Sequence, residues 1–269
     1  MNLEIIYCHV LSAFPSDANL SKIAVVLIGV VVGFLSGLLG KGGSAISTPA
    51  LQIFAGLPPF VALASPLPAT LPTAISASVA YSKEKLINKR VVFFSVLFGT
   101  PSTIIGSLLS HKLGGNTLML LTAVFVFLLG VSFFIKHSAP EPSKEGSIPL
   151  LNVSVIAIFI GFLSGLLANS GGILFGPLFI RFLKMPAKHA IASSLAVAAA
   201  LAIPGTITHW YLGHIDWEIV LLLSLSSIPF SYFGAKLAMH LDNQFLENTF
   251  GILLIVFGLF DLWYSIVHS

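Results

Sequence analysis

Long apolar stretches, separated by short polar or charged segments, follow one another through most of the chain. Most are about 20 residues long, which is the length a helix needs to cross the roughly 30 Å hydrocarbon core of a bilayer. Strands of a membrane barrel would be about half as long and would alternate apolar and polar residues. The pattern predicts ten helical segments, at about residues 21–40, 44–56, 61–82, 91–111, 117–135, 152–168, 172–183, 189–210, 217–239 and 245–266.

Two of these segments, 44–56 and 172–183, are short. A helix of about 13 residues reaches only about 20 Å, which is less than the hydrocarbon thickness. Each is therefore predicted to be a half-helix, a tilted short helix or one arm of a re-entrant hairpin.

The composition gives the same class. The chain of 269 residues is 56% hydrophobic and only 9% charged, with a mean hydropathy of +0.99, whereas a soluble domain carries about 25% charged residues. We therefore predict an all-α polytopic membrane protein with eight to ten membrane segments. The net charge of +3 is scattered over loops, so no nucleic-acid-binding surface is expected, and the single cysteine, Cys8, excludes an internal disulfide.

The strongest signal in the chain is an internal repeat. The sequence GFLSGLL occurs at 33–39 and again at 161–167, an offset of 128 residues, and glycines and prolines keep this offset without a gap for roughly 100 residues. We predict an N-terminal leader at 1–20, a first repeat at 21–135, a proline-rich cytoplasmic linker at 136–150 and a second repeat at 151–269.

Equivalent loops of the two repeats carry opposite charge. The loop between the third and fourth segments holds four Lys or Arg residues in the first repeat (83–90) and none in the second (209–218). The loop between the second and third segments shows the reverse, with none in the first repeat and three in the second (181–189). The positive-inside rule then predicts two inverted-topology repeats of about five segments each, with both termini outside.

Each repeat has a glycine break after its first segment. We expect the half-helix that follows to present unpaired N–H groups and the positive end of its dipole to an anion near the midplane. A purely structural turn is the alternative, and Lys41 could instead snorkel at the cytoplasmic face. The predicted substrate-binding residues are Gly40, Lys41, Gly42, Gly43 and Ser44 at the first break, and Asn169, Ser170, Gly171 and Gly172 at the second.

A second polar cluster follows in the third segment of each repeat. Three prolines, Pro66, Pro68 and Pro72, free backbone carbonyls there, and nearby hydroxyls can satisfy these carbonyls or face a polar cavity. A kinked packing helix is the alternative. The residues added to the candidate site are Ser65, Thr70 and Thr73 in the first repeat, and Ser193 and Ser194 in the second.

Other motifs predict packing or interfacial roles. The GxxxG pairs Gly33/Gly37 and Gly161/Gly165 favour close helix packing. The eight histidines lie near segment ends or loops and are expected at the membrane interface. We identify no metal-ligand spacing, no catalytic cluster and no cofactor motif, so neither a metal site nor an enzyme site is predicted.

The glycine-broken motifs resemble those of the TauE/SafE family. The sequence GFLSGLLGKGGSAISTPAL followed by ALAS, and its echo GFLSGLLANSGGILFGPLF followed by AIASS, carry the resemblance, which covers about residues 21–266. It implies a multi-pass inner-membrane transporter that exports small sulfur-containing anions. Family members typically have a glycine triplet after the first helix, which Lys41 interrupts here.

Together these observations predict a secondary transporter that exports a small anion, sulfite or an organosulfonate such as sulfoacetate, by alternating access. The expected partners are this anion and the lipid bilayer, while proton or membrane-potential coupling and a homodimer stay open. The alternatives are an intramembrane enzyme and a non-transporting membrane assembly partner.

Overall fold

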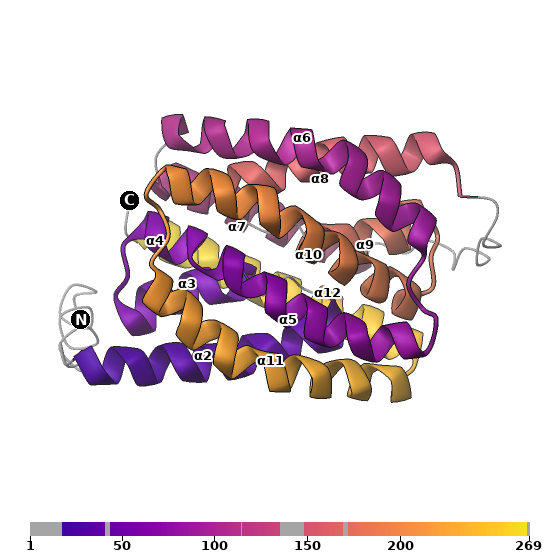
Figure 1. Ribbon diagram of the computed structural model, residues 1–269, viewed down its shortest axis with the longest axis horizontal. Coiled ribbons are helices and arrows are strands. Elements are labelled where there is room, and N and C mark those ends of the chain that lie inside the picture. Colours follow the sequence, from indigo (N-terminus) through magenta and orange to yellow (C-terminus); the bar gives the residue numbers. More distant parts are fainter. Residues whose placement is uncertain (1–17, 41–43, 114, 135–147, 169–171, 268–269) are drawn as a thin grey trace.

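The computed structural model describes residues 18–40, 44–113, 115–134, 148–168 and 172–267, with some helical side chains among them left out (Figure 1). Within these ranges all the regular secondary structure is helical, and turns or loops connect the helices. The helices are α2 (Ala18–Leu39), α3 (Ser44–Ala55), α4 (Pro59–Ala64), α5 (Pro66–Lys83), α6 (Lys89–Leu113), α7 (Gly115–Phe134), α8 (Leu150–Leu166), α9 (Gly172–Phe182), α10 (Ala187–Tyr211), α11 (Trp217–His240) and α12 (Asn243–Val267).

The helix bounds lie within a few residues of the predicted segments, with one exception. The segment expected at 61–82 is divided at Ser65 into α4 and α5. Pro66 has no N–H to donate to the carbonyl four residues earlier, so the helix is interrupted there. At the equivalent position of the second repeat stands Ser194, which keeps its N–H, and α10 runs through it without a break.

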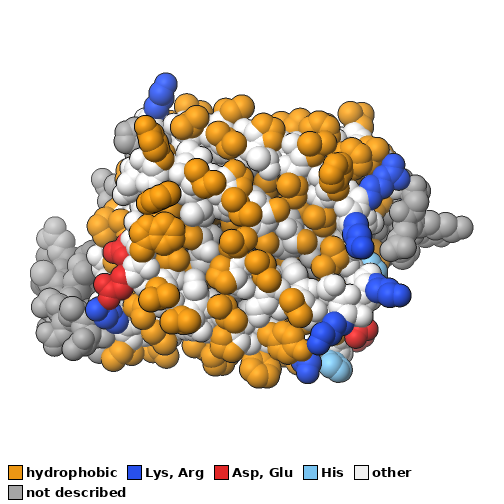
Figure 2. All heavy atoms as spheres, in the orientation of Figure 1, with side chains coloured by type: hydrophobic (Ala, Val, Ile, Leu, Met, Phe, Trp, Pro, Cys, Tyr) orange, Lys and Arg blue, Asp and Glu red, His pale blue; other side chains and the backbone are white. Residues whose placement is uncertain are grey.

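The fold is that of a membrane-spanning protein. Six helices of the described residues are long and apolar enough to cross a bilayer, and α8, with 17 residues, is shorter. The outer surface is apolar: Leu27, Phe93 and Leu151 are all more than half exposed. Figure 2 shows hydrophobic side chains over the middle of one face, with Lys and Arg at its two ends, most of them at the right-hand end.

The closest helix contacts join one repeat to the other. Helix α2 of the first repeat packs along α11 of the second, and α8 of the second packs along α6 of the first. A Cβ added to Gly37 would collide with the backbone of Ser231, and one added to Gly165 would collide with the backbone of Thr103. Gly37 and Gly165 are 128 residues apart in the chain, as are Thr103 and Ser231. The two crossings are therefore equivalent, and the GxxxG glycines pack closely, as predicted.

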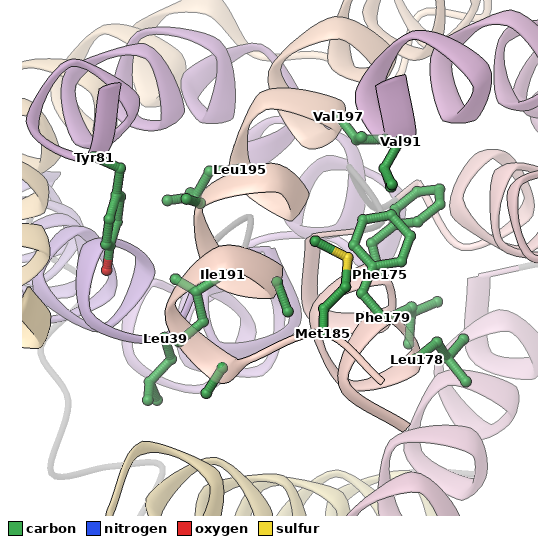
Figure 3. Packing of buried hydrophobic residues seen from close by; sticks show 14 of the residues in the cluster. Leu39, Tyr81, Val91, Phe175, Leu178, Phe179, Met185, Ile191, Leu195 and Val197 are labelled. Atoms are coloured by element: carbon green, nitrogen blue, oxygen red, sulfur yellow. The ribbon is translucent and has the colours of Figure 1, made fainter. Parts of the chain in front are cut away.

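The largest apolar cluster lies around α9 and the first half of α10. Phe175 and Phe179 of α9 are fully buried, with their ring centroids 5.4 Å apart. Figure 3 shows them beside Met185 and close to Val91 and Val197. This short helix is thus surrounded by protein, which allows it to be shorter than the bilayer is thick.

Candidate functional site

Both glycine breaks begin with a residue in the left-handed backbone region. Gly40 has φ +67° and its equivalent, Ala168, has φ +47°. An L-residue with a Cβ adopts this conformation at a cost of about 1–2 kcal/mol, so the turn is costly at Ala168 and easy at Gly40. The two breaks thus begin with the same backbone conformation, although only the first has glycine at this position.

Six of the nine predicted substrate-binding residues at the two glycine breaks lie outside the described part of the chain. Ser44 begins α3, but its side chain is not described, and Gly172 begins α9 and is buried. The residues within the breaks carry the proposed positive charge and side-chain amide, and their anion-binding roles remain predictions. Those outside the described residues are Lys41, Gly42, Gly43, Asn169, Ser170 and Gly171.

Ser194 links the second repeat to the first break. Its buried Oγ lies 3.3 Å from the carbonyl oxygen of Gly40 and 2.9 Å from that of Ile191. A Cβ at Gly40 would come within 2.8 Å of this Oγ. The predicted residues Gly40 and Ser194 are therefore in contact, and glycine is required at position 40 both for its backbone conformation and for space.

Ser65, between α4 and α5, and Ser193, in the first half of α10, occupy equivalent positions. Figure 1 shows the junction of α4 and α5 and the beginning of α10 toward opposite ends of the bundle. Ser65 Oγ accepts a hydrogen bond from the backbone N–H of Asp216 at 3.0 Å, and Ser193 Oγ accepts one from that of Asn88 at 3.0 Å. Both acceptors are fully buried. Asp216 is the N-cap of α11, and Asn88 accepts from the N–H of Val91 in α6. These two serines hold helix N-termini and do not meet at one site.

Thr70 and Thr73 line a cavity among α2, α3, α5 and α11. Thr73 Oγ1 donates to the carbonyl of Ala69 at 2.7 Å and lies 2.5 Å from Ser227 Oγ. Ser227 Oγ likewise reaches a carbonyl of its own helix, that of Ser224 at 3.3 Å, so either hydroxyl can be the donor in the contact between them. The cavity has a volume of about 20 Å³, which is room for about one water molecule. Its lining is Gly29, Val32, Ser47, Pro66, Ala69, Thr70, Thr73, Leu223 and Ser227.

Three hydroxyl positions of this cavity carry apolar side chains in the second repeat. Phe175 replaces Ser47, Ala198 replaces Thr70, and Leu201 replaces Thr73, each 128 residues further along. All three are fully buried, and Phe175 and Leu201 belong to the largest apolar cluster. Two other lining positions have buried serines as their equivalents, Ser95 for Leu223 and Ser194 for Pro66, so the hydroxyls lie at different positions in the two repeats.

A buried histidine pair lies elsewhere, at the end of α10. His209 and His214 are 1% and 7% exposed, and their Nδ1 atoms are 3.2 Å apart. Nε2 of His209 lies 3.3 Å from the carbonyl oxygen of Gly165, and the His214 ring stacks on Phe60 with centroids 4.4 Å apart. Both residues lie near a helix end, as predicted, but neighbouring helices cover them, so they are buried within the protein.

The repeat could have identified this pair. Tyr81, the equivalent of His209, donates a hydrogen bond from its hydroxyl to the carbonyl of Gly37 at 2.8 Å, and Gly37 is the equivalent of Gly165. The contact between this helix position and the glycine carbonyl is thus kept in both repeats, while the side chain differs. In the described residues, no group of three or more His, Cys, Asp or Glu side chains gathers around a metal-sized site.

Comparison with known proteins agrees with this architecture. The family described as "Sulfite exporter TauE/SafE" matches residues 25–260. The chain is 26% identical over 254 residues to "Probable membrane transporter protein YunE" of Bacillus subtilis, an alignment that covers 86% of this chain and 92% of that protein. It is 27% identical over 252 residues to a "Probable membrane transporter protein" of Xylella fastidiosa, with 91% and 96% covered.

No solved structure matches the chain significantly. The family match extends over nearly all the helices described above, and its relatives bear the names of transporters, not of enzymes. Such a match, together with the six helices able to span a bilayer, identifies a multi-pass membrane protein. The chain belongs to the TauE/SafE family of membrane transporters.

Proposed function

We propose that this protein is a secondary transporter that exports a small oxyanion, sulfite or an organosulfonate such as sulfoacetate, across the inner membrane. The observation that carries the proposal is the hydroxyl-lined cavity of the first repeat, in a chain of a family described as sulfite exporters. Hydroxyl groups are neutral donors that can bind an oxyanion without holding it too tightly for release.

The position of α3 supports an anion in this cavity. Ser47, in the first turn of α3, is one of the lining residues. A helix N-terminus directs free N–H groups and a positive partial charge toward its ligand. Lys41 precedes α3 by three residues and would add a full positive charge. A lysine near the membrane midplane would cost roughly 3 kcal/mol to insert, so at that depth we would expect it to serve the substrate.

The cavity is too small for the anion as it stands, so transport requires the surrounding helices to separate. Thr70 and Thr73 belong to the first repeat, whereas Leu223 and Ser227 of α11 belong to the second. The cavity thus lies between the two halves, where rocking of one against the other would open it alternately to each side.

An inverted arrangement of the repeats is part of the proposal. Figure 1 shows α2 beginning at the left end of the bundle and α8 beginning at the right end. The loops from α5 to α6 and from α9 to α10, with the helix ends that flank them, carry seven of the described Lys and Arg residues, against Lys22 and Lys112 at the other end. We take the basic end as cytoplasmic, with both chain termini outside. A reporter fused to each terminus tests this orientation, and a cytoplasmic C-terminus would contradict it.

Flux from proteoliposomes preloaded with sulfite, sulfoacetate or sulfate tests the function. We expect the wild type to release at least one of these anions faster than protein-free liposomes. Thr73→Val should raise the KM about tenfold, because a hydrogen bond to a charged ligand contributes about 1.5–3 kcal/mol, and Lys41→Ala should lower flux at least as much. Thr208→Val is the matched control, because its hydroxyl bonds to Pro204 within α10, away from the cavity.

Two results would overturn parts of this proposal. If none of the three anions moves, the protein is not an exporter of this substrate class, and a non-transporting assembly role gains support. If anions move but Lys41→Ala transports like the wild type, the anion-binding role of Lys41 is wrong while the transport function stands.

A further inference from the structure

The histidine pair has a hydrogen-bonding pattern that determines where its protons lie. A carbonyl oxygen only accepts, so Nε2 of His209 must carry the proton that is donated to Gly165. A neutral His209 then has an unprotonated Nδ1. The 3.2 Å contact requires Nδ1 of His214 to be the donor. In the neutral pair, each ring therefore has one assigned N–H.

This arrangement has room for one additional proton and not for two. A proton added to the second ring nitrogen of His214 makes that ring a cation and leaves both hydrogen bonds intact. A second added proton would have to go to Nδ1 of His209, where it would face the N–H of His214 at 3.2 Å. Two donors cannot form this contact, so the pair would have to separate.

The pair contacts α8 and α4, and His214 itself lies in the loop before α11. His209 bonds to Gly165 in the last turn of α8, three residues before the end of the described segment at Ala168. His214 stacks on Phe60 of α4. In the same loop, the N–H of Asp216 is bonded to Ser65, which joins α4 to α5. A charge gained by the pair therefore acts on α8, on α4 and on the loop before α11.

The charged groups of the described residues near the pair are already engaged or exposed. Asp216 Oδ1 accepts from the N–H groups of Glu218 and Ile219. Glu218 forms an ion pair with Lys22 of α2. Helices α4, α7 and α8 have no acidic or basic residue, and Lys112, in the last turn of α6, is exposed. Among the groups that the structure describes, protonation of the pair itself is therefore the main change of charge here.

We propose that His209 and His214 together form the proton-binding site that couples proton movement to anion transport, with one proton bound per cycle. This inference rests on the transport function proposed above. The first repeat supports it by contrast, because Tyr81 and Leu86 stand at the equivalent positions. Tyrosine preserves the bond to the glycine carbonyl and stays neutral near pH 7. Only the second repeat can therefore exchange a proton there.

The test uses proteoliposomes with the membrane potential held at zero by potassium and valinomycin. Sulfoacetate is the probe, or sulfate if sulfoacetate is not carried, because both remain ionised near pH 7. In the wild type, a gradient of one pH unit should drive about tenfold accumulation of the anion. With one proton coupled to one anion and no membrane potential, a tenfold proton gradient is balanced by a tenfold anion gradient. The side on which the anion accumulates distinguishes co-transport from exchange, and either direction supports the proposal.

The variants replace the pair by the side chains of the first repeat. His209→Tyr with His214→Leu should retain anion counterflow within about twofold of the wild type but lose accumulation driven by the pH gradient. His214→Gln, whose amide can still donate to His209, should behave in the same way if the double variant fails to fold. Tyr81→Phe is the matched control and should keep both counterflow and pH-driven accumulation.

Several outcomes overturn the inference. Full accumulation in the histidine variants would show that the proton binds elsewhere, and an equal loss in Tyr81→Phe would show a structural effect. Loss of coupling after chelation, with recovery on adding Zn²⁺, would make the pair a metal ligand. If the wild type moves no anion, the transport function fails. The proton site is then decided by NMR of ¹⁵N-labelled histidine, where a single protonation step shared by both rings is expected and two independent steps would refute it.

Discussion

In the first repeat, Thr70 and Thr73 face a cavity that they share with Ser47 and Ser227. In the second repeat, the equivalents of Thr70, Thr73 and Ser47 are the buried apolar residues Ala198, Leu201 and Phe175. At the helix end that contacts the glycine carbonyl, the second repeat instead holds the side chain suited to a function. The titratable His209 stands there, whereas the first repeat has the neutral Tyr81.

This difference separates what the duplication retains from what each half has changed. The backbone crossings at Gly37 and Gly165, and the serine contacts at Ser65 and Ser193, are present in both halves. Such contacts position the helices, so a change in one half would disturb the whole bundle. The side chains that face the interior spaces differ freely, and we infer that substrate binding and proton binding were assigned to different halves.

The largest expected effect comes from the two equivalent crossings. Gly37→Val and Gly165→Val each place a side chain against the backbone of the facing helix. Overpacking typically lowers the free energy of unfolding by about 1–3 kcal/mol. Because backbone on both sides of the contact cannot move aside, we expect each variant to lose about 3 kcal/mol or more. Size-exclusion profiles in detergent should show little folded protein for either variant, with Val155→Leu on the exposed face of α8 as the control. A folded Gly165→Val would break the equivalence of the crossings.

A smaller effect is expected from exchanging the contents of the two interior spaces. Thr73→Leu puts the second repeat's side chain into a cavity with room for about one water, so anion flux per folded molecule should fall at least tenfold. Leu201→Thr opens the apolar region instead and should cost about 2–3 kcal/mol of stability, mostly from lost apolar burial, while flux per folded molecule stays near the wild type. Equal flux losses in both variants would contradict the unequal roles of the halves.

The smallest effect is expected from removing the hydroxyls of the two equivalent serines. Ser65→Ala and Ser193→Ala each leave one buried backbone N–H without its acceptor, which costs about 1–3 kcal/mol. The two variants should lower the Tm by similar amounts, within about 3 °C of each other. Thermal unfolding followed by light scattering measures this difference. A much larger loss for one serine would show that its contact does more than hold a helix end.

Much of the fold could be predicted from the sequence because the information is local. Hydrophobic length set the helix bounds within a few residues, and the glycines and prolines marked the short helices α3 and α9. The division at Ser65 was not predicted, since several prolines lie nearby and the pattern alone does not say which one interrupts the helix. Pro72, for example, lies inside α5.

The candidate site was less accessible to prediction, because it depends on contacts between segments far apart in the chain. The sequence marked Thr70 and Thr73 as polar within an apolar segment but carried no sign that Ser227, 154 residues later, would complete their cavity. The histidine pair was missed for a related reason: closeness to a helix end suggested exposure, and burial came from Phe60 and Gly165 in other helices. Lys41 stays a prediction, since it lies outside the described residues.

The pairing of α2 with α11 has a consequence for how the chain is made. The glycine face of α2 has its partner only after α11 has been synthesised, almost the whole chain later. At translation rates of about 5–20 residues per second, this takes roughly 10–40 s. During that time α2 lies in the bilayer with its narrow glycine face against lipid. Assembly of the first helix is therefore a late event in biosynthesis, and truncation anywhere before α11 should leave an early helix open to quality-control proteases.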